Sequence, residues 1–142
     1  MSSSDLSPFP MPMWYLLDEQ GNPYPTKDTR AASELLCNIE KRRVGQVEKE
    51  VMGHTVWLST VFLVLEHMDW STSPPRPALF ETMLFIDGHE IGSATERYAT
   101  RKEAIDGHQD ILEKVEQLLM MLGDRNIDFT EIAGLIGGTS DE

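Results

Sequence analysis

The sequence predicts an α+β domain, in which an antiparallel β-meander of about four strands packs against an N-terminal helix and a long C-terminal helix. Three observations indicate this class. Two apolar stretches, residues 55–65 and 78–86, are rich in the β-branched and aromatic residues that suit a pleated sheet. Asp87-Gly88 follows the second stretch directly and is a strong hairpin signal. Beyond it, apolar residues recur at helical spacing from Ala104 to Leu122.

The chain length fits one domain with a segment of different composition at each end. It has 142 residues, which is enough for a core without disulfides, and its single cysteine excludes an intrachain disulfide. Residues 1–13 alternate proline with Phe9, Met11 and Met13, and this pattern predicts an extended N-terminal arm. Residues 14–123 hold the predicted strands and helices. Residues 124–142 form an acidic tail with a small amphipathic patch.

The first elements are short. Residues 14–17 read as a strand and residues 18–23 as a turn. A helix is predicted from a cap at Thr26 or Asp28 to about residue 41, because its apolar residues recur at helical spacing. Residues 44–52 then alternate apolar with charged side chains, which is typical of a half-exposed edge strand.

The two apolar stretches are predicted to be neighbouring inner strands of one sheet. In the first stretch both the odd positions (Trp57, Val61) and the even positions (Leu58, Phe62) are apolar. Such a strand is usually covered on both faces. Helices would cover one face, and the N-terminal arm, the C-terminal tail or a second subunit could cover the other, so a homo-oligomer is one interpretation. The segment between the strands, residues 66–77, is predicted to be a loop.

A fourth strand and the long helix complete the predicted domain. Residues 90–99 should form the last strand of the meander. Thr100 and Glu103 then make a capping box, in which each side chain satisfies a free backbone N–H of the first turn. The helix should end at Gly123.

The charge excludes some classes of function. With 12 basic and 24 acidic residues the net charge is −12, so the chain should repel phosphate backbones and not bind nucleic acid directly. The excess acid favours solubility, and it would also complement a partner with a basic surface. There is no apolar run long enough to span a membrane and no secretory signal, so we expect an intracellular protein.

Three ordered blocks resemble a known group of sequences. They are Leu58-Ser-Thr-Val-Phe-Leu-Val-Leu-Glu-His67, Leu79-Phe-Glu-Thr-Met-Leu-Phe85 after Pro74-Pro75, and Arg97-Tyr-Ala-Thr100 followed by Glu103-Ala104 and Gly107-His108. Together they are similar to a family of small uncharacterised proteins encoded by bacteriophages and prophages. The resemblance covers about residues 42–110. The chain departs from it at Val64, where the family has glycine, and at Glu66, Ala99 and Arg101. The resemblance implies a phage origin and a compact fold, with no assigned activity.

The polar residues within these blocks are the candidates for chemistry. Glu81 is a lone carboxylate in an apolar strand, so it needs a partner, and Arg97 on the neighbouring strand is the natural one for a structural pair. If the protein is an enzyme, His67, Glu81, Tyr98 and His108 are the candidate catalytic residues. The residue types that could hold a metal are His67, His89 and His108 with Asp69, Asp87 and Glu90, but their spacing matches no metal-ligand motif. No P-loop, dinucleotide fingerprint or nucleophile elbow is present, so we expect neither a metal nor another cofactor.

Candidate binding residues lie in two places. Trp70 and Arg76 in the segment 66–77 are residue types that favour binding hot spots, and Asp106, Asp110 and Glu113 lie on the long helix. The first hypothesis is an accessory protein that binds a host or phage protein with a basic surface in the host-cell cytoplasm, for example to inhibit host defence or regulation. The alternatives are a virion or assembly component and a small metal-dependent hydrolase or ligand-binding protein.

Overall fold

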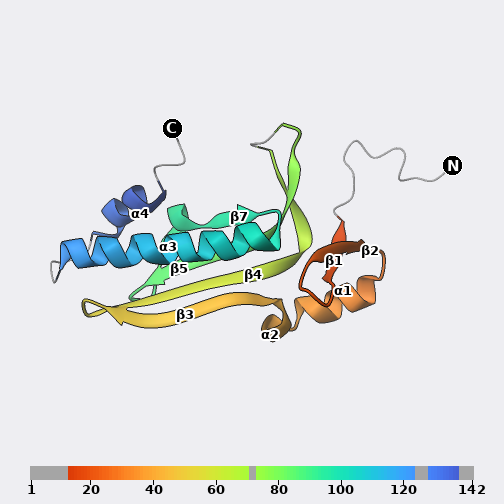
Figure 1. The fold of residues 1–142 in the computed structure, drawn as a ribbon, viewed down its shortest axis with the longest axis horizontal. Helices are drawn as coiled ribbons and strands as arrows, with labels where there is room; N and C mark the ends of the chain where they lie inside the picture. Colours follow the sequence, from red (N-terminus) through yellow and green to blue (C-terminus); the bar gives the residue numbers. More distant parts are fainter. Residues whose placement is uncertain (1–12, 71–72, 124–127, 138–142) are drawn as a thin grey trace.

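The computed structural model describes residues 13–70, 73–123 and 128–137 (Figure 1). Apart from Met13, the predicted N-terminal arm lies outside the described residues, as do the two ends of the predicted C-terminal tail. The described chain is a mixed α and β fold with one large antiparallel sheet and a long C-terminal helix, as the sequence predicts.

The sheet has seven strands and not about four. The strands are β1 (Trp14–Leu17), β2 (Pro23–Thr26), β3 (Arg43–Val51), β4 (His54–Asp69), β5 (Arg76–Ile86), β6 (His89–Glu90) and β7 (Glu96–Tyr98). The sequence predicts a turn and a helix start where β2 pairs with β1. The predicted fourth strand is instead two short strands, β6 and β7, because the chain leaves the sheet between them in a 3₁₀ turn at Gly92–Ala94.

β4 and β5 are adjacent antiparallel strands at the centre of the sheet, as predicted. Val56 to Phe62 pair with Ile86 to Phe80, and one edge of β4 is shared by β3 and, further along, by β1. β3 and β4 form a hairpin. Its two-residue turn, Met52-Gly53, has φ angles of 53° and 84°, which match the right-handed twist of the strands.

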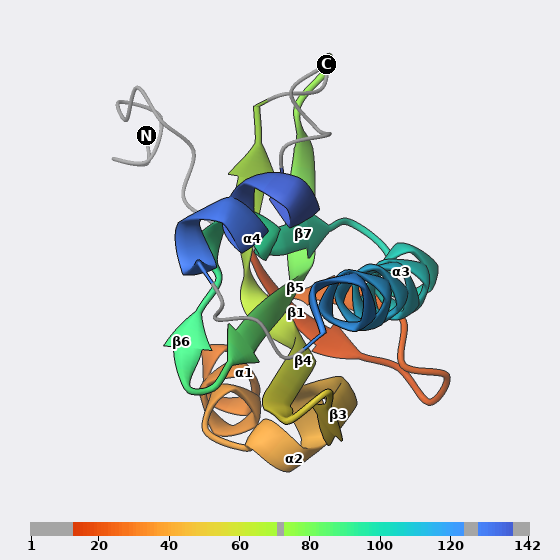
Figure 2. The same cartoon turned by 90° about the vertical axis from the view of Figure 1, so that its left-hand side faces the viewer.

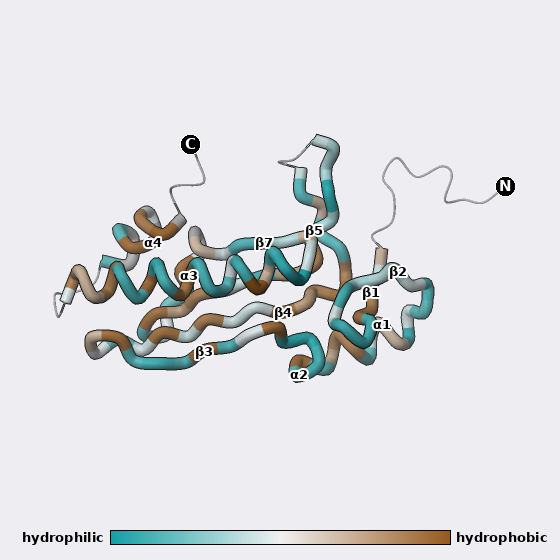
Figure 3. The backbone as a smooth tube through the Cα atoms, viewed as in Figure 1, coloured by the Kyte–Doolittle hydropathy of each residue, from teal (hydrophilic) through white to brown (hydrophobic). Residues whose placement is uncertain are grey.

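Only one face of the central strands is fully covered, which corrects the prediction that both are. The even residues of β4 from Val56 to Val64 are buried, whereas the odd residues from Trp57 to Leu65 are only half-buried. On this second face Trp57 packs against Phe85 of β5, with ring centroids 5.1 Å apart. The strands therefore alternate in burial although their sequence does not alternate in hydropathy (Figure 3).

The segment predicted to be a loop between β4 and β5 is largely strand. After a shift in register, His67, Met68 and Asp69 pair with Ala78, Pro77 and Arg76. The two strands thus continue beyond the sheet as a projecting ribbon, residues 66–70 and 73–78, which we call the arm and which is distinct from the predicted N-terminal arm (Figure 1).

The N-terminal helix is shorter than predicted. Helix α1 spans Thr29–Leu36 and is capped by Asp28, whose carboxylate accepts a hydrogen bond from the Ala31 backbone N–H. A separate short helix, α2 (Ile39–Arg42), begins at Asn38, whose side chain accepts from Lys41 N–H. A polar cap in the middle of the apolar pattern therefore divides the single predicted helix into two.

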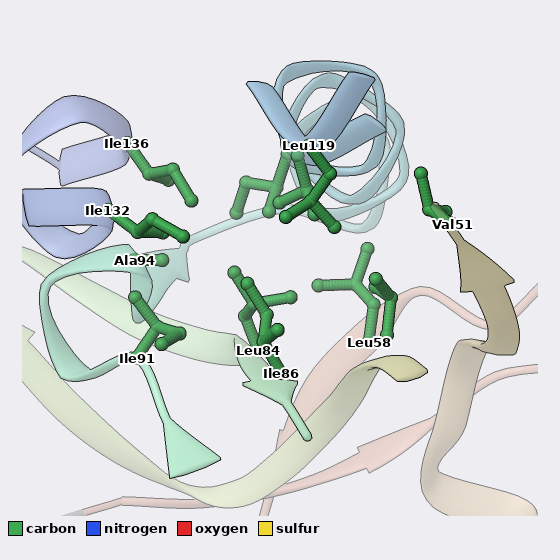
Figure 4. Packing of buried hydrophobic residues seen from close by; sticks show 12 residues of the cluster. Val51, Leu58, Leu84, Ile86, Ile91, Ala94, Leu119, Ile132 and Ile136 are labelled. Carbon is green, nitrogen blue, oxygen red and sulfur yellow. The ribbon is translucent and has the colours of Figure 1, made fainter. Parts of the chain in front are cut away.

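Helix α3 (Arg101–Leu122) has the predicted capping box, and its chain leaves the helix at Gly123 with φ 65°. Helix α4 (Phe129–Gly137) follows, and in an end view both helices lie on the same side of the sheet (Figure 2). Ile132 and Ile136 of α4 join Leu119 of α3 and residues of β4 and β5 in one buried cluster (Figure 4). At about 25 cal/mol per Å² of buried apolar surface, clusters of this kind supply most of the stability of a small domain.

Candidate functional site

Polar side chains meet in the middle of the apolar layer between the sheet and α3. Thr60 of β4 and Thr82 of β5 are opposite one another, fully buried, and hydrogen-bonded through their hydroxyl oxygens. Thr60 Oγ1 lies 2.8 Å from His108 Nδ1 of α3. Because buried polar groups are costly unless they are paired, this cluster fixes the position of the helix on the sheet.

Tyr98 of β7 packs at the edge of this cluster. It is 8% exposed, and its hydroxyl makes no hydrogen bond of ordinary geometry with any of the described residues. Burial raises the pKa of Tyr98 to about 12, although the neighbouring Thr82 hydroxyl acts in the opposite direction. The phenol therefore stays protonated at neutral pH. It fits against α3 only because residue 107 is glycine, since a Cβ there would overlap the ring and its hydroxyl.

His108 connects the buried cluster with the surface. Burial lowers the pKa of its imidazole, so the ring is neutral at neutral pH. Its outer edge faces Gly45 of β3, and it lines a small surface cleft of about 310 Å³ together with Ile105 and Gln109. A neutral histidine bonded to a hydroxyl is the arrangement of a nucleophile with its base, but Thr60 is fully buried and no substrate could reach it. The cluster is therefore structural.

The four residues proposed for catalysis are not brought together. Tyr98 and His108 lie on the helix face of the sheet. Glu81 precedes the buried Thr82 in β5, so its side chain points to the opposite face. His67 is exposed on the arm.

The structure does bring Glu81 and Arg97 together. Arg97 Nε donates a hydrogen bond to Glu81 Oε2 at 3.0 Å, and the two residues are directly opposite in β5 and β7. The Glu81 side chain is 17% exposed and that of Arg97 is 51% exposed, so this is a partly solvated pair on the half-buried face.

No group of three or more histidine, cysteine, aspartate or glutamate side chains gathers in the described part of the chain in a way that could hold a metal ion. None of the helices in that part has both the length and the apolar character that a membrane span requires.

The arm carries the other candidate residues. Trp70 is 74% exposed, and Met68, two residues before it, is 38% exposed. Trp70 and Met68 line a surface cleft of about 560 Å³ that continues to Glu96 and Arg97. Arg76, in contrast, is engaged within the chain, because its Nη2 donates to Glu103 Oε1 at 2.6 Å and ties the base of the arm to the first turn of α3.

The three acidic candidates on α3 share one solvent-facing side of the helix. Asp106, Asp110 and Glu113 are all exposed. Asp106 accepts a hydrogen bond from Lys102 and Glu113 one from Gln109, whereas Asp110 makes no ion pair within the described residues. We call this side the acidic face of α3.

Sequence reasoning missed Thr60, because a threonine within an apolar strand is ordinary. Thr60 is one of the even-numbered residues of β4, like Val56, Leu58 and Phe62, which are all buried. This shared face of the strand was the signal that could have identified it. Comparisons of this chain with protein families, with curated proteins and with solved structures find no match.

Proposed function

We propose that this protein acts by binding another protein, with Trp70 at the end of the arm as its anchor. The observation that carries this proposal is the 74% exposure of a tryptophan on a projecting two-stranded ribbon. Tryptophan is among the residues that contribute most to protein interfaces when a partner covers them. A side chain so exposed contributes little to the stability of its own fold.

The acidic face of α3 supports a partner with a basic surface. Asp106, Asp110 and Glu113 add local charge of the same sign as the net charge of −12. Such a field accelerates association with a basic surface and disfavours acidic competitors. The ion pair between Arg76 and Glu103 joins the base of the arm to the same helix, so the two features are neighbours in the structure.

The resemblance to phage-encoded sequences supports a more specific form of the proposal. In that form the protein is a phage accessory factor in the host-cell cytoplasm, and it inhibits a host defence or regulatory protein by occupying its basic surface. A buried polar cluster that no substrate could reach supports binding over catalysis.

Affinity capture from infected host cells tests the proposal. The full chain, Trp70→Ala and Tyr24→Ala are compared as baits; Tyr24 is the matched control, because it is a 44% exposed aromatic residue outside the arm. We expect one host or phage protein to be retained by the full chain and by the control and to be lost with Trp70→Ala. A partner retained equally by all three baits would exclude the arm as the anchor.

Charge reversal tests the electrostatic part separately. Asp106, Asp110 and Glu113 are changed together to lysine, and an equal reversal of the exposed residues Glu34, Glu48 and Glu50 is the control. Association rates with the captured partner should fall for the first variant and depend on salt, because steering by exposed charges is screened at high ionic strength. If the control slows association as much as the first variant does, only the net charge matters and not this face.

A further inference from the structure

We propose that a cleft beside the β1–β2 turn binds a small molecule that carries one oxyanion group, a carboxylate or a phosphate, on an apolar body. We call it the basic cleft. Its volume is about 480 Å³, and three cationic residues from three elements line it: Lys41 of α2, Arg43 of β3 and Arg101 of α3. This volume lies within the range of about 300–1,000 Å³ that is usual for small-molecule sites.

The cations of the basic cleft differ from most others on this acidic chain. Five described cations elsewhere are paired with carboxylates: Arg30 with Glu34, Lys49 with Glu116, Arg76 with Glu103, Arg97 with Glu81 and Lys102 with Asp106. Within the part of the chain that the structure describes, Lys41 and Arg101 make no ion pair. The chain has twice as many acidic as basic residues, yet these two cations in one concave site are not paired with any of those that the structure describes. They are therefore able to bind an anionic ligand.

Arg43 adds a third positive charge to the same cleft. One guanidinium nitrogen, Nη1, donates to Glu40 Oε1 at 3.0 Å. Its Nε is buried and has no hydrogen-bond partner among the described residues. Because this nitrogen is inaccessible to solvent, it is not itself a ligand contact, and Arg43 contributes to the cleft through the positive charge of its guanidinium.

Arg101 is positioned by the β1–β2 turn and not by a carboxylate. Its guanidinium packs on Gly21, where an added Cβ would lie 2.9 Å from Nη1, and Gly21 has φ 82°. Asp18 Oδ1 holds the turn by accepting hydrogen bonds from the backbone N–H groups of Gln20 and Asn22, each at 2.9 Å. The guanidinium therefore lies against a turn whose backbone is itself held by hydrogen bonds.

The remaining lining defines the rest of the ligand. Leu16, Leu17 and Leu35 supply apolar surface, which suits an aliphatic or aromatic body. Asp18 and Glu19 also line the cleft, so its residues carry three positive and two negative charges. That balance favours a single anionic group and disfavours polyphosphates or nucleic acid. The planar fork of arginine suits both carboxylate and phosphate oxygens.

A titration of the full ¹⁵N-labelled chain, followed by amide chemical shifts, tests the proposal. The probes are octanoate and octyl phosphate, with octanol as the uncharged control and with acetate and inorganic phosphate as head groups alone. We expect saturable shifts at residues 16–21, 41–43 and 101 with octanoate or octyl phosphate. Whichever of the two binds more tightly identifies the head group. Arg101→Ala and Lys41→Ala should each weaken this binding about tenfold, the usual scale for one charge-assisted hydrogen bond.

Lys114→Ala is the matched control, because Lys114 is an exposed cation of α3 that makes no ion pair within the described chain and lies outside the cleft. It should leave the affinity unchanged. Lys41 is exposed, so Lys41→Ala remains informative if Arg101→Ala does not fold. Octanol binding as tightly as octanoate, an affinity unaffected by Lys41→Ala, or no saturable shift at these residues would each overturn the proposal. None of these outcomes bears on Trp70, so the proposed partner binding is tested independently.

Discussion

Gly107 is the residue at which the packing of α3 on the sheet is most sensitive to one added methyl group. In Gly107→Ala the new Cβ would lie well inside 3.0 Å of Tyr98 Cε1 and of its hydroxyl oxygen. Real Cβ atoms essentially never make such contacts, so either the ring or the helix must move. The ring has little room, because Tyr98 is 8% exposed and lies opposite the fully buried Phe80.

Two opposing effects set the size of the change. Replacing glycine by alanine within a helix contributes about 1 kcal/mol of stability. Forcing an extra methyl group into a packed interior costs about 1–3 kcal/mol, and displacing a buried aromatic ring can cost about 3–5 kcal/mol. The contact at residue 107 is with a rigid ring and not with the end of a flexible side chain, so the cost should exceed the gain. We expect a net loss of about 2 kcal/mol, which for a domain of this size lowers Tm by roughly 6 °C.

Urea unfolding followed by circular dichroism measures this loss, and Gly134→Ala is the matched control. Gly134 is also within a helix, α4, but apart from its own helix backbone and chain neighbours no atom of the described residues lies within 4 Å of the Cβ position there. The control should therefore gain up to about 1 kcal/mol from helix propensity alone. The opposite signs of the two substitutions isolate the packing at Gly107.

A double-mutant cycle identifies the cause. In the background of Tyr98→Leu, which removes the ring, Gly107→Ala should become neutral or stabilising, because contacting residues are not additive. If Gly107→Ala is as stable as Gly134→Ala in the unmodified chain, the close packing of Tyr98 on α3 is wrong.

Three other predictions follow from single positions. Val64→Gly should lower the free energy of unfolding by about 1–2 kcal/mol less than Val56→Gly does. Both substitutions remove a fully buried valine of β4, but only Val64 has a positive φ, 71°. Equal losses of unfolding free energy in urea would count against backbone strain at Val64. Burial lowers the folded-state pKa of His108 below the unfolded value of about 6.5, so its contribution to stability is complete above that pH and is lost as the pH falls towards the folded pKa. His108→Asn, which keeps an atom able to bond Thr60, should flatten this part of the pH profile of the unfolding free energy, and an unchanged slope would argue against a buried neutral imidazole. Thr100→Ala should cost about 1 kcal/mol through loss of the capping box, detected as a lower Tm, and an unchanged Tm would show that the helix start does not depend on it.

The features that the sequence predicted well are those fixed by local chemistry. The capping box at Thr100 and the helix end at Gly123 each depend on residues a few positions apart. The central pair of strands followed from composition, since β-branched and aromatic runs suit a sheet whatever surrounds them. Glu81 and Arg97 could be matched because a lone charge among apolar residues requires a partner.

The features that could not be predicted from the sequence depend on contacts between distant segments. Which face of β4 is buried depends on where α3 docks. The sequence does not reveal this, because Trp57 on the half-buried face is as apolar as Leu58 on the buried face. The arm was predicted to be a loop because its residues are polar, yet a ribbon stabilised by cross-strand pairing needs no apolar face. The basic cleft was not foreseen either, since Lys41 and Arg101 are 60 positions apart in the chain and only the tertiary fold brings them together.

The position of the proposed anchor, Trp70, follows from an irregularity in β4. Between the paired residues Phe62 and His67 four residues of β4 lie opposite only one residue of β5, Leu79, and Val64 has a φ of 71° within this bulge. An insertion of this kind bends a strand and increases its twist, so the ribbon beyond it leaves the plane of the sheet. Glycine is the residue for which such a φ carries little strain, and valine is not. Strain held at a bulge persists only when the surrounding packing enforces it, and here it directs an exposed tryptophan away from the body of the protein. The bulge also serves the fold, since Leu65 pairs with Trp14 of β1 and Val64 is fully buried, so the support for the proposed binding role lies in the exposure of Trp70 on the ribbon beyond it.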